Sequence, residues 1–234
     1  MIVLGIETAT RVCGAALVRD GKLISEHFIH KERIHSEKLL AIIDIVLAQN
    51  SSYDVIAVSI GPGSFTGLRI GTSVAKGLSL ASGKPVIAVS TLEALAFKAV
   101  QEGFALNGDI VIGMIDARRS DVYAAAYVIN DGGLSVIWDP CAISVDEVLQ
   151  KSTTMGKVIA IGDAVSKFQE HCQRHAATTN IYFPPIDKAI SSAGSVAMLG
   201  EKRGERGLFT DIAMFEPLYI RDFQSLVDTQ HGNR

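Results

Sequence analysis

The segment Gly61-Pro-Gly-Ser-Phe-Thr-Gly67 has the residue types and spacing of a loop that holds a phosphate. It follows an apolar run and leads directly into a helical pattern. A helix N-terminus presents free backbone N–H groups and the positive end of the helix dipole. Gly61, Gly63 and Ser64 are therefore candidate phosphate ligands. No Gly-Lys-Ser/Thr follows, so the loop is not a P-loop, and its spacing differs from the dinucleotide-binding fingerprint. A purely structural tight turn explains the same residues equally well.

Acidic residues at two other places could complete a nucleotide site. Glu7 and Thr8 follow the first apolar run, where nucleotide-binding folds of this kind place an acidic residue that helps to hold a metal-bound phosphate. A single glutamate at the end of a strand also serves as a turn-capping residue, and this is the preferred interpretation. Gly162 and Asp163 are the residues of the second half that suggest a contact with adenosine.

Two histidines have the spacing of metal ligands. His171 and His175 stand at positions i and i+4, which places both on one face of a helix. No glutamate follows the first histidine, so the pattern is not that of a metalloprotease. A solvated helix face is the preferred interpretation of this polar stretch.

A third polar group lies in the segment Asp116-Ala-Arg-Arg-Ser-Asp-Val-Tyr123. Arg118 and Arg119 could bind a phosphate or a carboxylate through two parallel hydrogen bonds. They could also tie two domains together through Asp116, with Tyr123 beside them. The structural role, in a turn or between domains, is preferred.

The elements that must position these residues follow from the apolar pattern. Short apolar runs bounded by turn residues predict strands, and longer stretches with helical periodicity predict helices. The order strand-strand-strand-helix-strand-helix-strand-helix predicts a mixed sheet covered by helices. The predicted strands are 2–6, 13–18, 23–29, 55–60 and 85–89, and the predicted helices are 35–48, 66–81 and 91–100.

The pattern of the first strands recurs about 108 positions later. The strand Ile110-Val-Ile-Gly-Met-Ile-Asp116, a turn at 118–121, a second strand at 122–128 and a turn from Asn130 repeat the strand-turn-strand-turn order that starts at Ile2. Chance similarity of two hairpins is the alternative, but the preferred interpretation is a duplicated domain. We therefore expect a first domain over 1–103 and a smaller second domain over 104–234, with a C-terminal tail that returns to the first domain or lies flexibly beside it. In the second, a helix near 145–150, a strand at 158–161, a helix from about 164 and a final helix at 191–202 are expected.

The helix predicted at 35–48 has an unusually wide apolar face. Its apolar side chains cover an arc of roughly 220°, whereas a helix on one core needs a stripe of roughly 100° or a little more. The next helix carries small residues at every fourth position, which lets another helix approach closely. A helix sandwiched inside its own domain is the alternative to a protein interface. The predicted interface residues are His35, Leu39, Ile42, Ile43, Val46, Gly67, Leu68, Gly71, Thr72 and Ala75.

Composition narrows the class of protein. The net charge of −3 and the absence of a basic block argue against tight RNA binding by this chain alone. The three cysteines are widely spaced and indicate reduced thiols in the cytosol. The first residues indicate a strand and not a signal peptide, and no run is suited to span a bilayer. A cytoplasmic protein without membrane contact is expected.

Five motifs along the whole chain resemble the TsaB family, also called YeaZ. They are Leu4-Gly-Ile-Glu-Thr-Ala-Thr10, Gly61-Pro-Gly-Ser-Phe-Thr-Gly-Leu-Arg-Ile-Gly71, Val89-Ser-Thr-Leu-Glu-Ala-Leu95, Asp116-Ala-Arg-Arg119 with Tyr123, and Glu216-Pro-Leu-Tyr-Ile-Arg221. The resemblance implies an α/β fold of the actin/sugar-kinase/Hsp70 type (ribonuclease H-like), with two duplicated domains and a reduced second one. It also implies a role in making threonylcarbamoyladenosine next to the anticodon of ANN-decoding tRNAs.

The same resemblance implies how this role is shared between proteins. The paralogue TsaD carries the chemistry and holds a metal through an HxxxH pattern, where this chain has Thr91 and Leu95. Neither side chain can replace an imidazole. Implied partners are TsaD, the ATPase TsaE and tRNA bound by the assembly, with self-pairing into a homodimer when the chain is alone. No cofactor of its own is implied, and ATP or ADP would sit at the interface of the complex.

These observations favour a non-catalytic scaffold subunit. One rival is a small-molecule kinase or nucleotide hydrolase of the same fold, supported by the glycine loop and by Glu7. In the resembling family an aspartate often stands at that position, so the longer glutamate weakens this rival. A second rival is a regulatory module that senses a nucleotide without turning it over.

Overall fold

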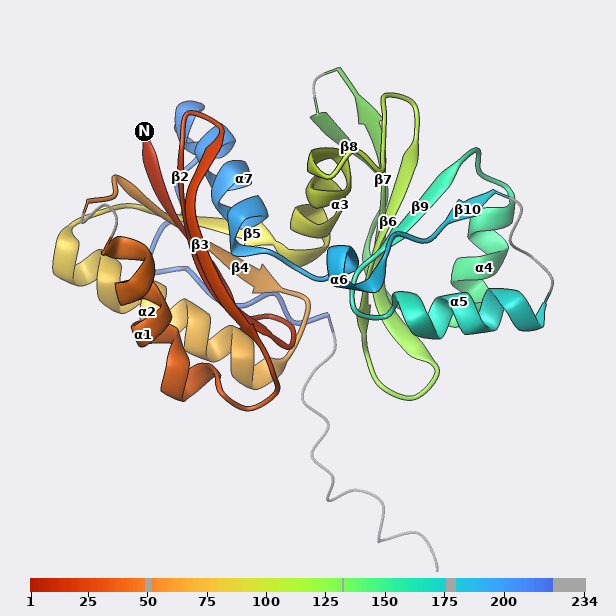
Figure 1. Ribbon diagram of the computed structural model, residues 1–234, viewed down its shortest axis with the longest axis horizontal. Helices are drawn as coiled ribbons and strands as arrows, with labels where there is room; N and C mark the ends of the chain where they lie inside the picture. The colour runs from red at the N-terminus through yellow and green to blue at the C-terminus, as the bar shows by residue number, and fades with distance from the viewer. Residues whose placement is uncertain (49–51, 132, 176–179, 221–234) are drawn as a thin grey trace, which may run out of the picture.

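The first half of the chain forms a mixed five-stranded sheet, seen in the computed structural model (Figure 1), which describes residues 1–48, 52–131, 133–175 and 180–220. The strand order is β3-β2-β1-β4-β5, in which β1 pairs antiparallel with β2 and parallel with β4. The elements are β1 (Ile2–Glu7), β2 (Val12–Arg19), β3 (Lys22–His30), α1 (His35–Leu47), β4 (Val55–Gly61), α2 (Phe65–Ser82), β5 (Val86–Ser90) and α3 (Thr91–Gln101).

The second half repeats this topology. Its sheet has the order β8-β7-β6-β9-β10. This is the order of the first sheet, β3-β2-β1-β4-β5, with each strand replaced by its counterpart. The duplication predicted from the repeat is therefore confirmed, and with it the two-domain fold class. The elements are β6 (Ile110–Asp116), β7 (Asp121–Asn130), β8 (Gly133–Ser144), α4 (Val145–Thr153), β9 (Val158–Ile161), α5 (Val165–Arg174), β10 (Ile181–Tyr182), α6 (Ile186–Ala189) and α7 (Ala193–Glu205).

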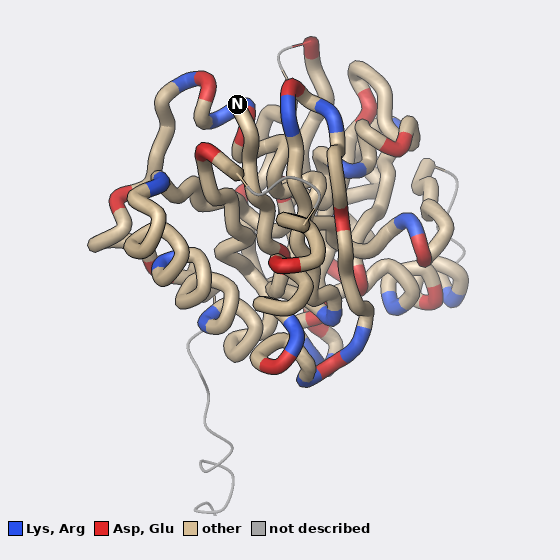
Figure 2. Tube along the Cα trace, turned by 60° about the vertical axis from the view of Figure 1, so that its left-hand side comes forward, with Lys and Arg blue, Asp and Glu red and all other residues tan. Residues whose placement is uncertain are grey.

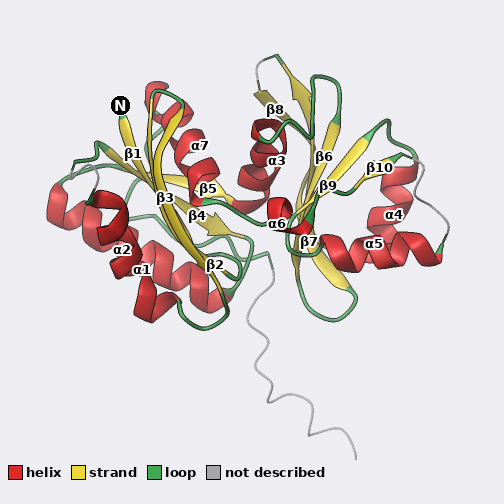
Figure 3. Cartoon of the chain, viewed as in Figure 1, coloured by secondary structure: helices red, strands yellow, loops and turns green. Residues whose placement is uncertain are grey.

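Each sheet is covered by helices on both faces (Figure 3), so its central strands are almost entirely buried and mostly apolar. In β1, Leu4 and Ile6 face a core shared with α1 and α2, whereas Val3 faces a core shared with α7. The second sheet packs one face against α4 and α5 and the other against α3.

The last helix of each half packs on the sheet of the other half. Leu92, Leu95 and Ala99 of α3 lie in a core with strands of the second sheet, and Val196 and Ala197 of α7 lie in a core with strands of the first. The two helices run beside each other between the sheets (Figure 1). The expected boundary of 104–234 for the second domain is therefore wrong for α7, because its apolar face completes the core of the first domain.

The segment after α7 also returns to the first domain. Thr210 forms a bridge with Val86, Phe215 is buried beside α1 and α2, and the backbone N–H of Leu218 donates to Ile60 O at 2.7 Å. Arg221 of the last motif lies outside the described residues. None of the described helices is long and apolar enough to cross a membrane.

Candidate functional site

The glycine loop connects β4 to α2 and lies against the turn that follows β1. The backbone N–H of Ser64 donates to Ala9 O at 2.7 Å, and its hydroxyl caps α2 by accepting from the Gly67 N–H at 3.2 Å. The Gly61 N–H donates to Thr91 Oγ1 at 3.2 Å, and the Leu68 N–H donates to Ser64 O. Three N–H groups of the loop, those of Gly61, Ser64 and Gly67, are thus engaged within the protein, and the Leu68 N–H forms the first hydrogen bond of the helix.

The small residues of α2 allow it to approach this turn closely. A Cβ atom at Gly67 would lie 2.1 Å from Thr8 O, and one at Gly71 would lie 2.2 Å from Thr8 Oγ1. At Gly63, a Cβ atom would lie 2.2 Å from Ala9 O. The predicted role of Gly67, Gly71 and Ala75 as an outward ridge is therefore wrong, because all three are buried against the chain's own first domain.

Alanine at Gly67 and alanine at Gly77 should have opposite effects on stability. Gly67→Ala forces a methyl group onto a backbone oxygen and should lower the free energy of unfolding by about 2 kcal/mol or more. A Cβ atom at Gly77, on the outer face of the same helix, meets no atom within 4 Å. Gly77→Ala should therefore raise the free energy of unfolding by about 0.5–1 kcal/mol, since alanine favours a helix. Urea unfolding measures both, and equal effects would contradict the packing described.

Glu7 is fully buried at the end of β1. Its Oε1 accepts a hydrogen bond from the Ala9 N–H at 2.6 Å, whereas Oε2 has no hydrogen-bond partner among the described residues. Burial raises the pKa of this carboxyl from 4.5 to about 7, and the nearby charge of Asp163 acts in the same direction. Hydrogen bonds from the Ala9 N–H and from Ser59 partly offset this rise. Glu7 is thus a turn-capping residue that holds a proton at mildly acidic pH.

Neither Glu7 nor Thr8 is reachable from solvent. Both have an exposed fraction of 0%. A carboxylate that holds a metal-bound phosphate needs an open side, because the metal and the phosphate must share its oxygens. The geometry therefore favours the structural interpretation of this strand end.

The candidate residues of the second half lie across from Glu7. Gly162 and Asp163 follow β9, and burial raises the pKa of Asp163. The carboxylate of Asp163 accepts a hydrogen bond from the Asp116 N–H at 2.9 Å. Gly162 has a φ of +127°, and a Cβ atom there would lie 1.8 Å from Met114 O. Both residues thus serve local packing between β6 and α5.

The arginine pair does not tie the domains together through Asp116. The Asp116 carboxylate pairs with Lys167 of α5, in its own domain, at 2.7 Å. Arg118 and Arg119 are exposed in the β6–β7 turn, where both adopt a positive φ. Tyr123 is partly buried at the edge of the core under α3. The interdomain role predicted for this group is corrected to a turn role.

Most of the residues predicted as a partner interface on α1 are core residues. Leu39, Ile42, Ile43 and Val46 have exposed fractions of 2% or less and pack on β1, β2 and β4. His35 is also buried, with its Nε2 at 3.1 Å from Thr10 O. On α2, Leu68 and Thr72 face inward as well, and the Thr72 hydroxyl donates to Leu68 O. These residues support the fold, so the prediction that they contact a partner is wrong.

The outward faces of the same helices carry different apolar residues, which sequence reasoning did not separate from the core. Leu40 and Ile45 of α1 are 59% and 50% exposed, and Leu80 of α2 is 78% exposed. Beside Leu80, the exposed residues Ser73, Gly77 and Ala81 form a stripe of small side chains. The 3.6-residue period combined with the position of the sheet would have found this surface, here called the outer helical face.

Thr91 and Leu95 have structural roles. Thr91 is buried and accepts from the Gly61 N–H, whereas Leu95 packs in the core under the second sheet. All three cysteines are unpaired. Burial raises the pKa of Cys13 and of Cys172 to about 11, so neither thiol readily forms a thiolate nucleophile. His171 lies in the last turn of α5 and His175 is its C-cap residue, and both lie next to Asp146 of α4.

Two duplicated mixed sheets, exchanged final helices and a glycine loop against the first strand end define the class of protein: a two-domain protein of the actin/sugar-kinase/Hsp70 type. Two solved structures from Pseudomonas aeruginosa have this fold. One, an uncharacterized protein with similarity to peptidase YeaZ, is 26% identical and has a TM-score of 0.79 over 94% of this chain and 99% of the other. The second, YeaZ, is also 26% identical, with a TM-score of 0.72 over 93% and 99%.

Sequence comparison then identifies the family. The family model of TsaD, tRNA N6-adenosine threonylcarbamoyltransferase, matches residues 23–226. The tRNA threonylcarbamoyladenosine biosynthesis protein TsaB of Buchnera aphidicola is 31% identical over 83% of this chain and 90% of its own length. TsaB of Escherichia coli is 37% identical over 57% of this chain, and the match spans 58% of that relative's length. The chain belongs to the TsaB family.

Proposed function

We propose that this chain is a non-catalytic subunit of the assembly that transfers a threonylcarbamoyl group to the adenosine beside the anticodon of ANN-decoding tRNAs. The observation that carries the proposal is the burial of the strand end beside the glycine loop, where the sequence suggests a phosphate site. Glu7 and Thr8 are fully buried, and the backbone N–H groups of Gly61, Ser64 and Gly67 are engaged within the protein. The names of the relatives and the replacement of the metal-binding histidines by Thr91 and Leu95 support it further.

The outer helical face is the proposed docking surface for the catalytic paralogue TsaD. Leu40, Ile45 and Leu80 give it apolar anchors, and the small residues around Gly77 leave room for a partner helix. The same face would pair two copies of the chain in the absence of TsaD. Basic and acidic residues are interspersed in Figure 2, which fits a subunit that leaves the main tRNA contacts to the assembly.

The remaining parts of the assembly are those implied by the family. TsaE joins the pair, and ATP or ADP binds at the interface of the complex and not within this chain alone. The chain acts where its tRNA substrate resides, in the cytoplasm.

A drop-out reconstitution tests the proposal directly. TsaC, TsaD, TsaE, ATP, bicarbonate, threonine and an ANN-decoding tRNA are combined with and without this chain. Multi-turnover formation of threonylcarbamoyladenosine should require the chain, and the chain without TsaD should modify no tRNA. Transfer that proceeds equally well without it would contradict the proposed function.

Two further measurements separate this proposal from the nucleotide-handling rivals. The purified chain should not hydrolyse ATP, and calorimetry with ATP or ADP should detect no binding to the chain alone. Turnover that is lost in Glu7→Ala would favour a kinase or hydrolase. Binding without turnover would favour a nucleotide sensor.

A further inference from the structure

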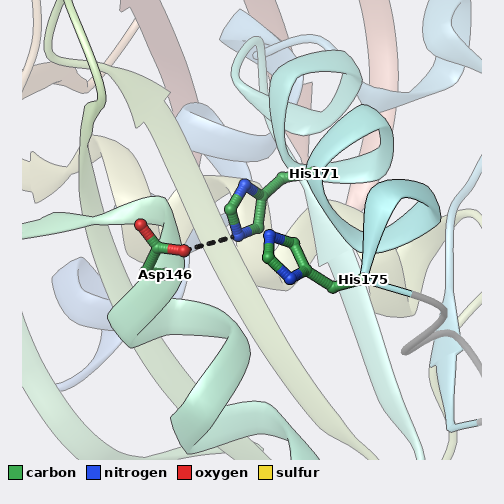
Figure 4. A group of neighbouring side chains, drawn as sticks. All are labelled: Asp146, His171 and His175. Atoms are coloured by element: carbon green, nitrogen blue, oxygen red, sulfur yellow. Dashed lines mark ion pairs between the residues drawn. The ribbon is translucent and has the colours of Figure 1, made fainter.

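Three metal-ligating side chains come together on the outer side of the second domain. Asp146 lies in the first turn of α4, His171 lies on α5, and His175 caps the C-terminal end of α5. The sequence places the two histidines on one helix face, but only the packing of α4 against α5 adds the carboxylate. Figure 4 shows the three side chains converging from the two helices.

The donor atoms are close enough to share one ion. His171 Nε2 lies 2.9 Å from Asp146 Oδ1, and the two imidazole rings have their centroids 4.5 Å apart. One donor atom from each residue lies within 4.8 Å of the other two. Within the described ranges, this is the group of three or more potential ligands that the structure brings together.

The nitrogen of His171 that faces Asp146 is also buried. The residue is only 8% exposed, and its Nε2 forms no aligned hydrogen bond with a described residue although the Asp146 carboxylate is near. Buried polar atoms are nearly always satisfied by a hydrogen bond or by an ion. The partner of Nε2 is the Asp146 carboxylate oxygen 2.9 Å away, in a geometry that is not aligned for a hydrogen bond, so a shared ion would satisfy both atoms.

We infer that Asp146, His171 and His175 bind a divalent transition metal ion of the zinc class. Two imidazoles and one carboxylate suit such an ion, whereas Mg²⁺ prefers oxygen ligands. Bonds of about 2.0–2.1 Å around one ion bring its donor atoms to roughly 3–3.5 Å from one another. The pair formed by Asp146 and His171 already meets this requirement, and the exposed ring of His175 can rotate to complete it.

The bound ion would cross-link α4 and α5 and leave a coordination position for water. Because α4 and α5 contribute Val148, Leu149 and Phe168 to one core, a cross-link between them would stabilise the outer layer of the second domain. The site lies on the opposite side of the second sheet from α3 and is independent of the outer helical face.

Zinc titration of the full chain tests the inference. After treatment with a chelator, the chain should bind one Zn²⁺ ion per molecule in calorimetry and should show a higher midpoint of thermal unfolding with Zn²⁺ than with Mg²⁺. The affinity for Zn²⁺ should fall roughly tenfold or more in Asp146→Asn and in His175→Ala, since even loss of a residue behind a ligand costs about that much. Both side chains are exposed, so these variants should fold.

Matched controls separate this site from scattered histidine contacts. His27→Ala and His30→Ala remove exposed histidines of β3 and should leave zinc affinity unchanged. With Co²⁺ as the probe, the visible absorption of a nitrogen-ligated ion should appear in the unmodified chain and be weakened in His175→Ala. Absence of Zn²⁺ binding, or an affinity that both site variants leave unchanged, would overturn the inference.

Discussion

Under the proposed docking to TsaD, Ile45→Asp should abolish the association of the two proteins while leaving this chain folded. Ile45 is half exposed on α1, so aspartate there costs little in the free chain. In a complex, the carboxylate would be buried against an apolar partner without a counter-charge. The expected cost is about 3 kcal/mol, or roughly 100-fold in the dissociation constant. Pull-down with tagged TsaD and calorimetry measure the loss, and the proposed homodimer should not form in the same variant.

Two comparison variants make this test specific. Ile137→Asp places the same charge at an exposed apolar position of β8, on the other domain, and should bind TsaD normally. Leu39→Asp puts the charge into the core under α1 and should unfold the chain, with a cost above about 4 kcal/mol. A folded Ile45→Asp protein that retains both the complex and the homodimer would exclude α1 as the docking helix.

Glu7→Gln should remove a large pH dependence from the stability of the chain. The folded carboxyl has a pKa of about 7, raised by burial from the ordinary value of 4.5. Between these two pH values the folded chain holds a proton that the unfolded chain has released. The free energy of unfolding therefore falls as the pH rises, by about 1.4 kcal/mol per pH unit and about 3 kcal/mol in all. This contribution of Glu7 to the free energy of unfolding is fully present below about pH 4.5 and lost by pH 7 to 8.

The glutamine variant keeps the shape and an oxygen that accepts from the Ala9 N–H, but it has no proton to lose. Relative to the unmodified chain, it should gain about 3 kcal/mol of stability between pH 5 and pH 8 in urea unfolding. Glu37→Gln removes an exposed carboxylate of α1 and controls for the change in net charge. Parallel pH profiles for the unmodified chain and Glu7→Gln would show that Glu7 ionises freely when folded.

The fold could be predicted from the sequence to a large extent. All eight elements predicted for the first half exist, with ends within two residues of the structure, because continuous apolar runs and helical periods are strong local signals. The second half was harder. β8, β10 and α6 were not predicted, since β8 is only partly buried and irregular in register, and the other two are very short.

The candidate site could be predicted only in part. The sequence located the glycine loop and the end of β1, but burial decides whether Glu7 can hold a phosphate, and burial depends on the approach of α2 to Thr8. The structure confirms that apolar residues cover a wide arc of α1. However, its members divide into core residues such as Leu39 and surface residues such as Ile45, and the direction of the sheet decides which is which. Asp146 was missed because nothing local connects it to His171.

The exchange of final helices has a consequence for how the chain is made. A ribosome synthesises β1 to β5 long before α7. The side chains of Val3, Val18 and Ala57 on one face of the first sheet therefore stay uncovered until α7 is made near the end of synthesis. During the same interval α3 has no second sheet to cover. Neither half can therefore bury its apolar surface alone, and the nascent first half stays exposed to aggregation until its duplicate has emerged.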